Sequence, residues 1–156
     1  TMTLMPTSTY ANTVREAQVV QQNLADVGIT TTINSPEWSQ WLDLEGAGNY
    51  DAYICGWTGL TDADSYYYLQ QHTGEVFNFT GYSNPDLDKL LEEGRSTSDF
   101  DKRYAIYQQA NKLLVDDAPY VYFYSPESLR AWKSDVEGFV NRPDQLNVLW
   151  TTWLNK

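Results

Sequence analysis

The chain is poor in the residues that most often build metal and redox sites. It has one cysteine, Cys55, and one histidine, His72. A single cysteine excludes an internal disulfide and a thiolate metal site, and a lone histidine is weak evidence for zinc or for catalysis. Because Cys55 stands in an apolar run, we expect a buried, unreactive thiol. For His72 we expect a hydrogen-bonding role on the surface or in a pocket.

Positive charge is also scarce. The chain has 10 Lys and Arg against 21 Asp and Glu, a net charge of −11, and no basic stripe. Nucleic-acid binding rests on basic side chains that neutralise phosphates, so the composition argues against that partner. The acidity favours solubility, and the sharper interpretation is attraction of a cationic ligand.

Two kinds of membrane-related segment are missing from the sequence as well. No apolar run reaches the length that a helix needs to cross a bilayer. The opening residues, TMTLMPTSTY, have neither the basic start nor the apolar centre of a signal peptide. We therefore expect a soluble chain that is either cytosolic or a piece of a longer protein.

What the chain does have is enough length for a core and a surplus of aromatic rings. Its 156 residues suit one domain, and 42% of them are hydrophobic. The 6 Trp, 12 Tyr and 5 Phe make up 15% of the chain. Trp and Tyr offer a large apolar face with a polar tip, so they suit a binding pocket as well as a core.

The first 57 residues alternate between strand and helix patterns. We expect strands at residues 2–9, 29–33 and 50–57, with a helix in each interval. Thr13 and Glu16 have the spacing of a capping box, and Gly28 is placed to end the first helix. The apolar stripes of the two helices are Ala17, Val20, Leu24 and Val27, then Trp38, Trp41 and Leu42. This order predicts a parallel sheet with covering helices, in which ligands bind beyond the carboxyl ends of the strands.

The stretch ICGWTGLTDADSYYY, residues 54–68, leaves the third strand at that edge. Trp57, a flexible Thr58–Gly59 step, two acids and three tyrosines follow the apolar run directly. Such an ending suits a binding site, although Trp57 alternatively closes the core. Tyr66, Tyr67 and Tyr68 cannot all face one way on a helix, so at least one of them lies in the core or on the surface.

The second half of the chain reads as helices followed by β-prone segments. Asp62 or Asp64 begins one helix, Asn84 caps a second that Gly94 ends, and Ser98 and Asp101 open the longest. In the longest helix we expect Tyr107, Ala110 and Leu114 to face the core. We expect Asn78 and Tyr82 to hold the loop before Asn84. Residues 120–124 (YVYFY) should form a strand, and one or two short strands should follow.

The acids of DADS do not fit two common kinds of site. A calcium loop that begins at Asp62 would need Gly at its sixth position and an acid at its twelfth, where this chain has Tyr67 and Thr73. The two acids lie only two residues apart, and glycosidase acids usually come from separate elements. No nucleophile elbow, phosphate loop or dinucleotide fingerprint is present.

Four ordered segments resemble a known family. They are QQNLADVGITTTI, YDAYICGWTG, FNFTGYSNPDLDKLLEEGR and the stretch from KRYAIYQQANKLL to SDVEGF. In this order they resemble the C-terminal part of the extracytoplasmic solute-binding proteins of peptide and nickel ABC importers, the family of dipeptide- and oligopeptide-binding proteins. The resemblance covers nearly the whole chain, and GYSNPDLDKLL is its most specific piece.

The resemblance implies an α/β fold: a mixed sheet with helices on both faces, as one lobe of a two-lobed fold like that of type II periplasmic binding proteins. Residues 1–128 would form the C-terminal lobe, and residues 129–156 would return toward the missing N-terminal lobe. A signal peptide would lie on that missing part, and the protein would be periplasmic or extracellular and membrane-anchored. It would be the non-enzymatic receptor that delivers a peptide or similar small polar solute to an ABC permease, without cofactor or metal.

The family also implies ligand contacts at the end of the third strand. By this resemblance the contacts fall on Gly56, Trp57, Thr58, Gly59 and Leu60, with Asp62 close by. Many peptide-binding members have an aspartate for the peptide amine where this chain has Leu60. Asp62 is a candidate substitute, and a modified peptide, a sugar derivative, an opine or another small polar solute stays open as the ligand.

Two other classes of function remain as alternatives. One is a carbohydrate-active enzyme, or an accessory carbohydrate-binding module, that uses Trp, Tyr and acids in a cleft. The other is a protein-interaction domain that uses its C-terminal aromatic residues. Without the missing lobe, the apolar side chains near the C-terminus would also favour self-association; they are Leu149, Trp150, Trp153 and Leu154.

Overall fold

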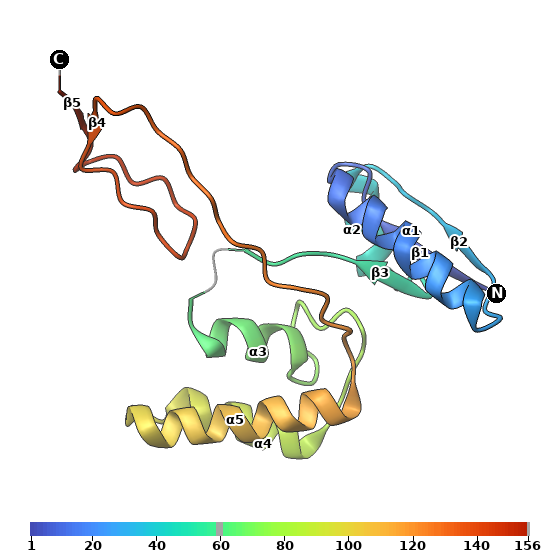
Figure 1. Ribbon diagram of the computed structural model, residues 1–156. Helices are drawn as coiled ribbons and strands as arrows, with labels where there is room; N and C mark the ends of the chain where they lie inside the picture. Colours follow the sequence, from blue (N-terminus) through green and yellow to red (C-terminus); the bar gives the residue numbers. More distant parts are fainter. Residues whose placement is uncertain (59–60, 156) are drawn as a thin grey trace. The chain divides into compact units, whose positions relative to one another are not determined.

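The computed structural model describes residues 1–58 and 61–155, and the chain divides into two compact units, Thr1–Gly56 and Trp57–Lys156 (Figure 1). The first unit contains strands β1 (Met2–Pro6), β2 (Thr31–Ile33) and β3 (Ala52–Ile54), separated by helices α1 (Ala11–Asp26) and α2 (Trp38–Gly46). The predicted alternation of strands and helices is therefore confirmed.

The three strands of the first unit form a parallel sheet in the order β2-β1-β3. Leu4 of the central strand stands opposite Ile33 on one side and Ala52 on the other. Each β–α–β crossover brings the next strand back parallel to the first, so all carboxyl ends lie at one edge. This is the edge that the sequence predicted as the ligand-facing one.

Helices cover both faces of the central strand. Leu4 and Met5 are neighbours, so their side chains point to opposite faces of the sheet, yet they are only 2% and 1% exposed. Helix α1 runs along the strands and packs on all three (Figure 1). From α2, Trp41 donates its indole N–H to the Met5 carbonyl at 2.9 Å. The predicted arrangement of a sheet between helices is present in this unit.

The start of α1 differs from the prediction. The N-cap residue is Tyr10, whose side chain makes no capping bond. Thr13 lies inside the helix and donates its hydroxyl to the Thr7 and Tyr10 carbonyls at 3.0 and 2.9 Å. The predicted capping box of Thr13 and Glu16 is therefore wrong, because its threonine ties the helix back to the end of β1. The predicted end is right, since Gly28 has a φ of 83°, in the left-handed region.

The predicted apolar stripes are only partly buried. Ala17 and Trp41 are fully covered, but Val27 is 70% exposed and Leu42 is 43% exposed. Val27 is exposed because it lies just beyond the last residue of α1. Leu42 is exposed because it is adjacent to the buried Trp41 in sequence and therefore points to a different side of α2.

The second unit contains helices α3 (Ala63–Gln71), α4 (Pro85–Ser96) and α5 (Phe100–Asp117). Helices α4 and α5 lie side by side with α3 against them (Figure 1). Their shared core consists of Leu87, Leu91, Tyr107, Ala110 and Leu114. The three core residues predicted for the longest helix are thus confirmed.

Gly94 does not end its helix. Helix α4 continues to Ser96, and Gly94 is buried inside it. A Cβ at this position would lie 2.9 Å from two ring carbons of Tyr107. The predicted C-cap is therefore wrong, and the glycine instead allows α4 and α5 to approach closely.

The two acids at the end of α5 have side-chain partners. Asp117 accepts hydrogen bonds from the Tyr82 hydroxyl at 2.6 Å and from the Asn84 amide at 2.7 Å. Lys112 pairs with Asp116 at 2.7 Å. These contacts offset the unfavourable position of negative charge at a helix C-terminus.

Residues 120–124 form no strand, so that prediction is wrong for the described chain. A strand forms only when its backbone groups pair with a neighbour, and the sheets of the described residues consist of β1 to β3 and of β4 (Val136–Glu137) with β5 (Trp153–Leu154). The short antiparallel pair β4–β5 confirms the predicted late strands. Within the described residues, no helix combines the length and the apolar character needed to cross a membrane.

Candidate ligand-binding site

The loops that follow β1 and β2 meet at the carboxyl edge of the sheet. Ser8 donates its backbone N–H to the Pro36 carbonyl at 2.8 Å. The Trp38 backbone N–H donates to the Thr9 hydroxyl at 3.2 Å. The starts of α1 and α2 are therefore held next to each other. The sequence analysis did not predict a role for these loops. Their position directly after parallel strands, where ligands of such sheets bind, would have indicated one.

A row of aromatic rings runs from this edge into the core of the first unit. Tyr10, which is 49% exposed, packs edge-on against Trp38 at 5.6 Å. Trp38 stacks on Trp41 at 5.1 Å, and Trp41 meets Tyr53 edge-on at 5.6 Å. The buried end of the row fixes the exposed end, so the edge offers a rigid aromatic surface.

A buried acid lies near the end of β3. Glu45, in the last turn of α2, is only 4% exposed, and burial raises its pKa to about 7. Burial, with a further contribution from the charge of Glu45, also raises the pKa of Cys55 to about 11. The Cys55 thiol donates to the Gly56 carbonyl at 3.6 Å. A thiol with this pKa stays protonated at neutral pH, which agrees with the predicted lack of reactivity. The predicted full burial is wrong, because Cys55 is only partly buried.

We expect Glu45 to make the stability of the chain depend on pH. Its pKa is about 7 in the folded chain against an ordinary value of 4.5, so the folded state binds more protons between these values. Stability should fall as the pH rises through this range and stay lower above it. Glu45→Gln should therefore be more stable than the wild type at pH 8, by about 1–3 kcal/mol, and equal to it near pH 4.

Urea denaturation of both proteins at the two pH values measures this effect. Glu127→Gln, an exposed acid changed in the same way, is the matched control and should show no such difference. If Glu45→Gln and the wild type unfold alike at pH 8, the carboxyl of Glu45 is not the source of a pH dependence.

The predicted binding segment begins with residues that solvent reaches. Gly56 and Thr58 are exposed and Trp57 is half-buried. The indole of Trp57 meets Phe77 edge-on, with ring centroids 5.1 Å apart. Phe77 therefore supports one side of the indole and leaves part of it accessible. Gly59 and Leu60, also predicted as contacts, lie outside the described residues.

Asp62 lies at the other end of this segment and has well-defined partners. It caps α3 by accepting the Asp64 backbone N–H at 2.8 Å. It also forms a two-point ion pair with Arg103, at 2.7 and 3.0 Å, which lowers the pKa of Asp62. Of the two acids predicted to begin this helix, Asp62 and Asp64, Asp62 is the one that caps it. Its carboxylate is already paired with the guanidinium of Arg103.

An open pocket of about 280 Å³ surrounds the start of α3, lined by Thr61, Asp62, Ala63, Tyr66 and Tyr67. The predicted division of the three tyrosines is confirmed: Tyr66 is exposed, whereas Tyr67 and Tyr68 pack against the core. The Tyr67 hydroxyl donates to Asn111 at 3.0 Å. The pocket therefore presents aromatic rings and polar groups beside a carboxylate that is already paired.

The loop before α4 is held as predicted. The Asn78 amide donates to the carbonyls of His72 and Tyr82 at 3.0 and 2.7 Å. Its oxygen accepts the Tyr82 backbone N–H at 3.1 Å. His72 lies stacked on Tyr68, with one ring nitrogen 3.1 Å from the Thr73 carbonyl and the other 3.4 Å from Glu92. Asn78 and His72 therefore have structural roles in hydrogen bonding.

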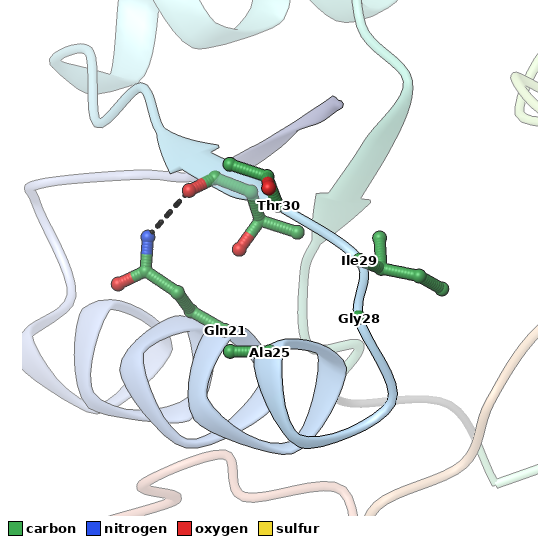
Figure 2. A pocket seen from close by; sticks show the side chains of 6 residues that line it. Gln21, Ala25, Gly28, Ile29 and Thr30 are labelled. Atoms are coloured by element: carbon green, nitrogen blue, oxygen red, sulfur yellow. Dashed lines mark hydrogen bonds between the residues drawn. The ribbon is translucent and has the colours of Figure 1, made fainter.

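A second pocket, of about 270 Å³, lies between α1 and the segment that leads into β2. Figure 2 shows the Gln21 amide reaching across it to the Thr31 carbonyl, at 2.8 Å. This pocket opens at the amino end of β2, opposite the carboxyl edge. It is therefore separate from the site that the strand order predicts.

The parallel sheet and its covering helices agree with the type II periplasmic-binding-protein fold, which the similar solved structures show. Residues 1–78 match the family model described as "Bacterial extracellular solute-binding proteins, family 5 Middle". The chain belongs to this family.

Similar proteins with assigned roles are peptide-binding proteins. The chain is 32% identical to the oligopeptide-binding protein AppA of Bacillus subtilis over 155 residues, which are 93% of this chain and 28% of that protein. It is 30% identical to the probable di/tripeptide-binding protein 5 of Pseudomonas aeruginosa over 131 residues, which are 81% of this chain and 25% of that protein.

Solved structures agree with this relationship. The periplasmic binding protein DppA of Helicobacter pylori, in complex with the peptide STSA, has a TM-score of 0.82 and 27% identity over 99% of this chain and 31% of that one. AppA of Bacillus subtilis, in complex with a nonapeptide, has a TM-score of 0.83 and 25% identity over 99% of this chain and 32% of that one. The chain thus spans about a quarter to a third of the length of these relatives.

Proposed function

We propose that this chain is part of the substrate-binding component of an ABC importer and that its ligand is a peptide. The observation that carries the proposal is the similarity to DppA with its bound tetrapeptide, which extends over 99% of this chain. The family is made of solute-binding proteins, and we propose a non-enzymatic role for this member too.

In this proposal the chain belongs to a longer, two-lobed protein. Residues 1–128 form the C-terminal lobe, and residues 129–156 return toward the other lobe. A ligand that contacts both lobes does so only when they close, so it stabilises the closed form. Coverage of about a third of DppA supports the proposal that another lobe supplies the remaining contacts.

The proposed ligand contacts lie on the segment that begins at Gly56. Trp57 packs its accessible ring surface on the ligand, and backbone groups of Gly56 and Thr58 hydrogen-bond an extended peptide. Gly59 and Leu60 continue the same segment in sequence. The exposure of Gly56 and Thr58 and the half-buried indole support this assignment. No metal or cofactor takes part.

The proposed working place is outside the cytoplasmic membrane, in the periplasm or anchored to the outer face of the membrane. There the closed protein hands its peptide to an ABC permease. A signal peptide would belong to the part of the longer protein that precedes this chain. The net charge of −11 fits a protein whose partners do not include nucleic acid.

The C-terminal aromatic residues fit a surface that another part of the protein covers. Trp150 is 83% exposed and Leu149 is 61% exposed, and Trp153 and Leu154 of β5 are each 53% exposed. We propose that the missing lobe covers them and that they mediate self-association when the 156-residue chain is alone. Light scattering at several concentrations measures this, and a strict monomer at all of them would contradict it.

The carbohydrate-active alternative is not favoured. As an enzyme it needs two carboxyl groups facing each other across a groove. Near the predicted segment, Asp62 is paired with Arg103 and Asp64 with Arg95. Both acids thus hold helices together.

Native mass spectrometry of the longer protein, purified without added ligand, tests the proposed function. We expect a bound species that fragments as a peptide. A bound sugar or other solute would overturn the peptide assignment, and a protein that neither carries nor takes up peptides would overturn the receptor role.

A further inference from the structure

The first unit contains a buried acid that has no partner. Glu45 is only 4% exposed. In the part of the chain that the structure describes, no hydrogen bond or ion pair reaches its side chain. Other acids of this unit do have partners: Asp51 accepts the Thr3 backbone N–H at 2.7 Å, and Glu37 accepts that of Ser39 at 3.2 Å. A carboxyl group taken out of water without such contacts costs free energy, and binding sites are where proteins most often keep a costly group of this kind.

This acid lies next to the end of β3. Glu45 stands one turn after Trp41 on α2, and both side chains are buried, so they face the same side of the helix. The charge of Glu45 acts on the thiol of Cys55, the residue that directly follows β3. Gly56 comes next and is exposed, and a Cβ at this position would meet nothing within 4 Å. The chain therefore leaves open space at Gly56, where the proposed ligand contacts begin and one residue beyond the neighbour of the acid.

The surroundings of Glu45 favour a positive charge that the first unit does not supply. Glu45 lies in the last turn of α2, where the helix dipole favours a cation, and this turn has no basic residue. Arg15 is the only basic residue in the sequence of this unit, and it is exposed on α1. An ammonium or guanidinium group of a ligand would therefore meet no competitor from this unit. It would also form a charge-assisted hydrogen bond to the carboxylate in a place where water screens the charges little.

We propose that Glu45 receives a positively charged group of the bound peptide and that the receptor therefore selects peptides that carry such a group. The group is an ammonium or a guanidinium, which a peptide offers as its terminal amine or as a lysine or arginine side chain. This inference rests on the proposed function and adds to it the class of peptide that the site prefers.

Glu45→Gln in the longer protein tests this role, because it removes the charge and keeps the size of the side chain. The probes are the peptide STSA, its N-acetylated form, and N-acetylated STKA, in which the lysine is the only cation. In calorimetric titrations at pH 7, the substitution should weaken the binding of STSA, of acetylated STKA or of both by more than about tenfold. The binding of acetylated STSA should not change. Asp43→Asn, which alters an exposed acid of the same helix, is the matched control and should affect none of the three peptides.

Proton release gives a second readout, which a purely structural role would not change. Burial raises the pKa of Glu45 to about 7, so the free protein holds a protonated carboxyl at pH 6. Among the described residues, the Cys55 thiol is the titratable group that interacts with it, and with a pKa of about 11 the thiol stays protonated. A bound cation stabilises the carboxylate, so the binding of a cationic peptide at pH 6 should release most of a proton. Titrations in phosphate and in imidazole buffer, whose ionisation enthalpies differ, measure this release, and Glu45→Gln should lack it.

The pattern across the three peptides separates the possible outcomes. A loss for STSA alone identifies the terminal amine as the bound group, and a loss for acetylated STKA identifies a side-chain cation. An equal loss for all three peptides would give Glu45 a structural role and overturn the proposal, as would unchanged binding in Glu45→Gln or binding of the cationic peptides without proton release. If the wild type binds acetylated STSA as tightly as the two cationic peptides, this inference fails and the proposed function stands. If the wild type binds none of the three, the proposed function fails, and this inference fails with it.

Discussion

Replacement of Trp57 by alanine in the longer protein is expected to weaken peptide binding more than tenfold, which corresponds to about 1.4 kcal/mol or more. The indole is half-buried and supported on one side by Phe77, so its position is fixed while part of its surface stays accessible. A rigid aromatic face of this kind loses little entropy when a ligand packs on it. Calorimetric titration with STSA measures the change.

Two further variants make this result specific. Trp57→Phe keeps an aromatic face and should retain most of the affinity. Tyr104→Ala removes a ring of α5 that is 59% exposed and lies outside the proposed segment, so it should have no effect. Equal affinities of wild type and Trp57→Ala would remove Trp57 from the binding site.

Replacement of Leu91 by alanine is expected to destabilise the helical unit by about 2–5 kcal/mol. Leu91 is fully buried in the core that α4 and α5 share. The helices are held close by the Gly94–Tyr107 approach, so they cannot readily collapse into the space that the smaller side chain leaves. Urea denaturation of the 156-residue chain, followed by circular dichroism, measures the loss.

Leu129→Ala is the matched control for this experiment. The same atoms are removed, but Leu129 is 83% exposed, so the stability of the chain should change by less than about 0.5 kcal/mol. A similar loss in both variants would mean that Leu91 is not a core residue of the folded chain.

Local sequence patterns predicted most of the regular structure. Asn84 and Pro85 mark the start of α4, and the structure begins the helix there, with the Asn84 side chain accepting the N–H groups of Asp86 and Leu87. Gly28 likewise marks the end of α1. These signals work because the residues that cap a helix act on backbone groups within the same turn.

Features that depend on distant partners were not predictable in this way. Gly94 looked like a helix end because nothing in its neighbourhood reveals the Tyr107 ring that passes over it. Residues 120–124 have a strong preference for β-structure, but a strand also needs an adjacent strand to pair with. The sequence pattern cannot say whether such a neighbour exists.

The candidate site also combines features that local sequence patterns predict with features that depend on distant residues. Its place at the end of β3 followed from strand order, and the half-buried state of Trp57 agrees with a ring that does not simply close the core. The role of Asp62 did not follow, because its partner Arg103 is 41 residues away in the chain. The sequence offered Asp62 as a ligand contact or a helix cap, and the structure adds an ion pair that no local pattern indicates.

The central claim is that this chain supplies one of the two surfaces that contact a bound peptide. Calorimetric titration of STSA into the longer protein and into the 156-residue chain, side by side, tests it most directly. We expect micromolar or tighter binding to the longer protein and no measurable binding to the chain alone, since half of the contacts would be missing. Equal micromolar affinity of both proteins would contradict the account.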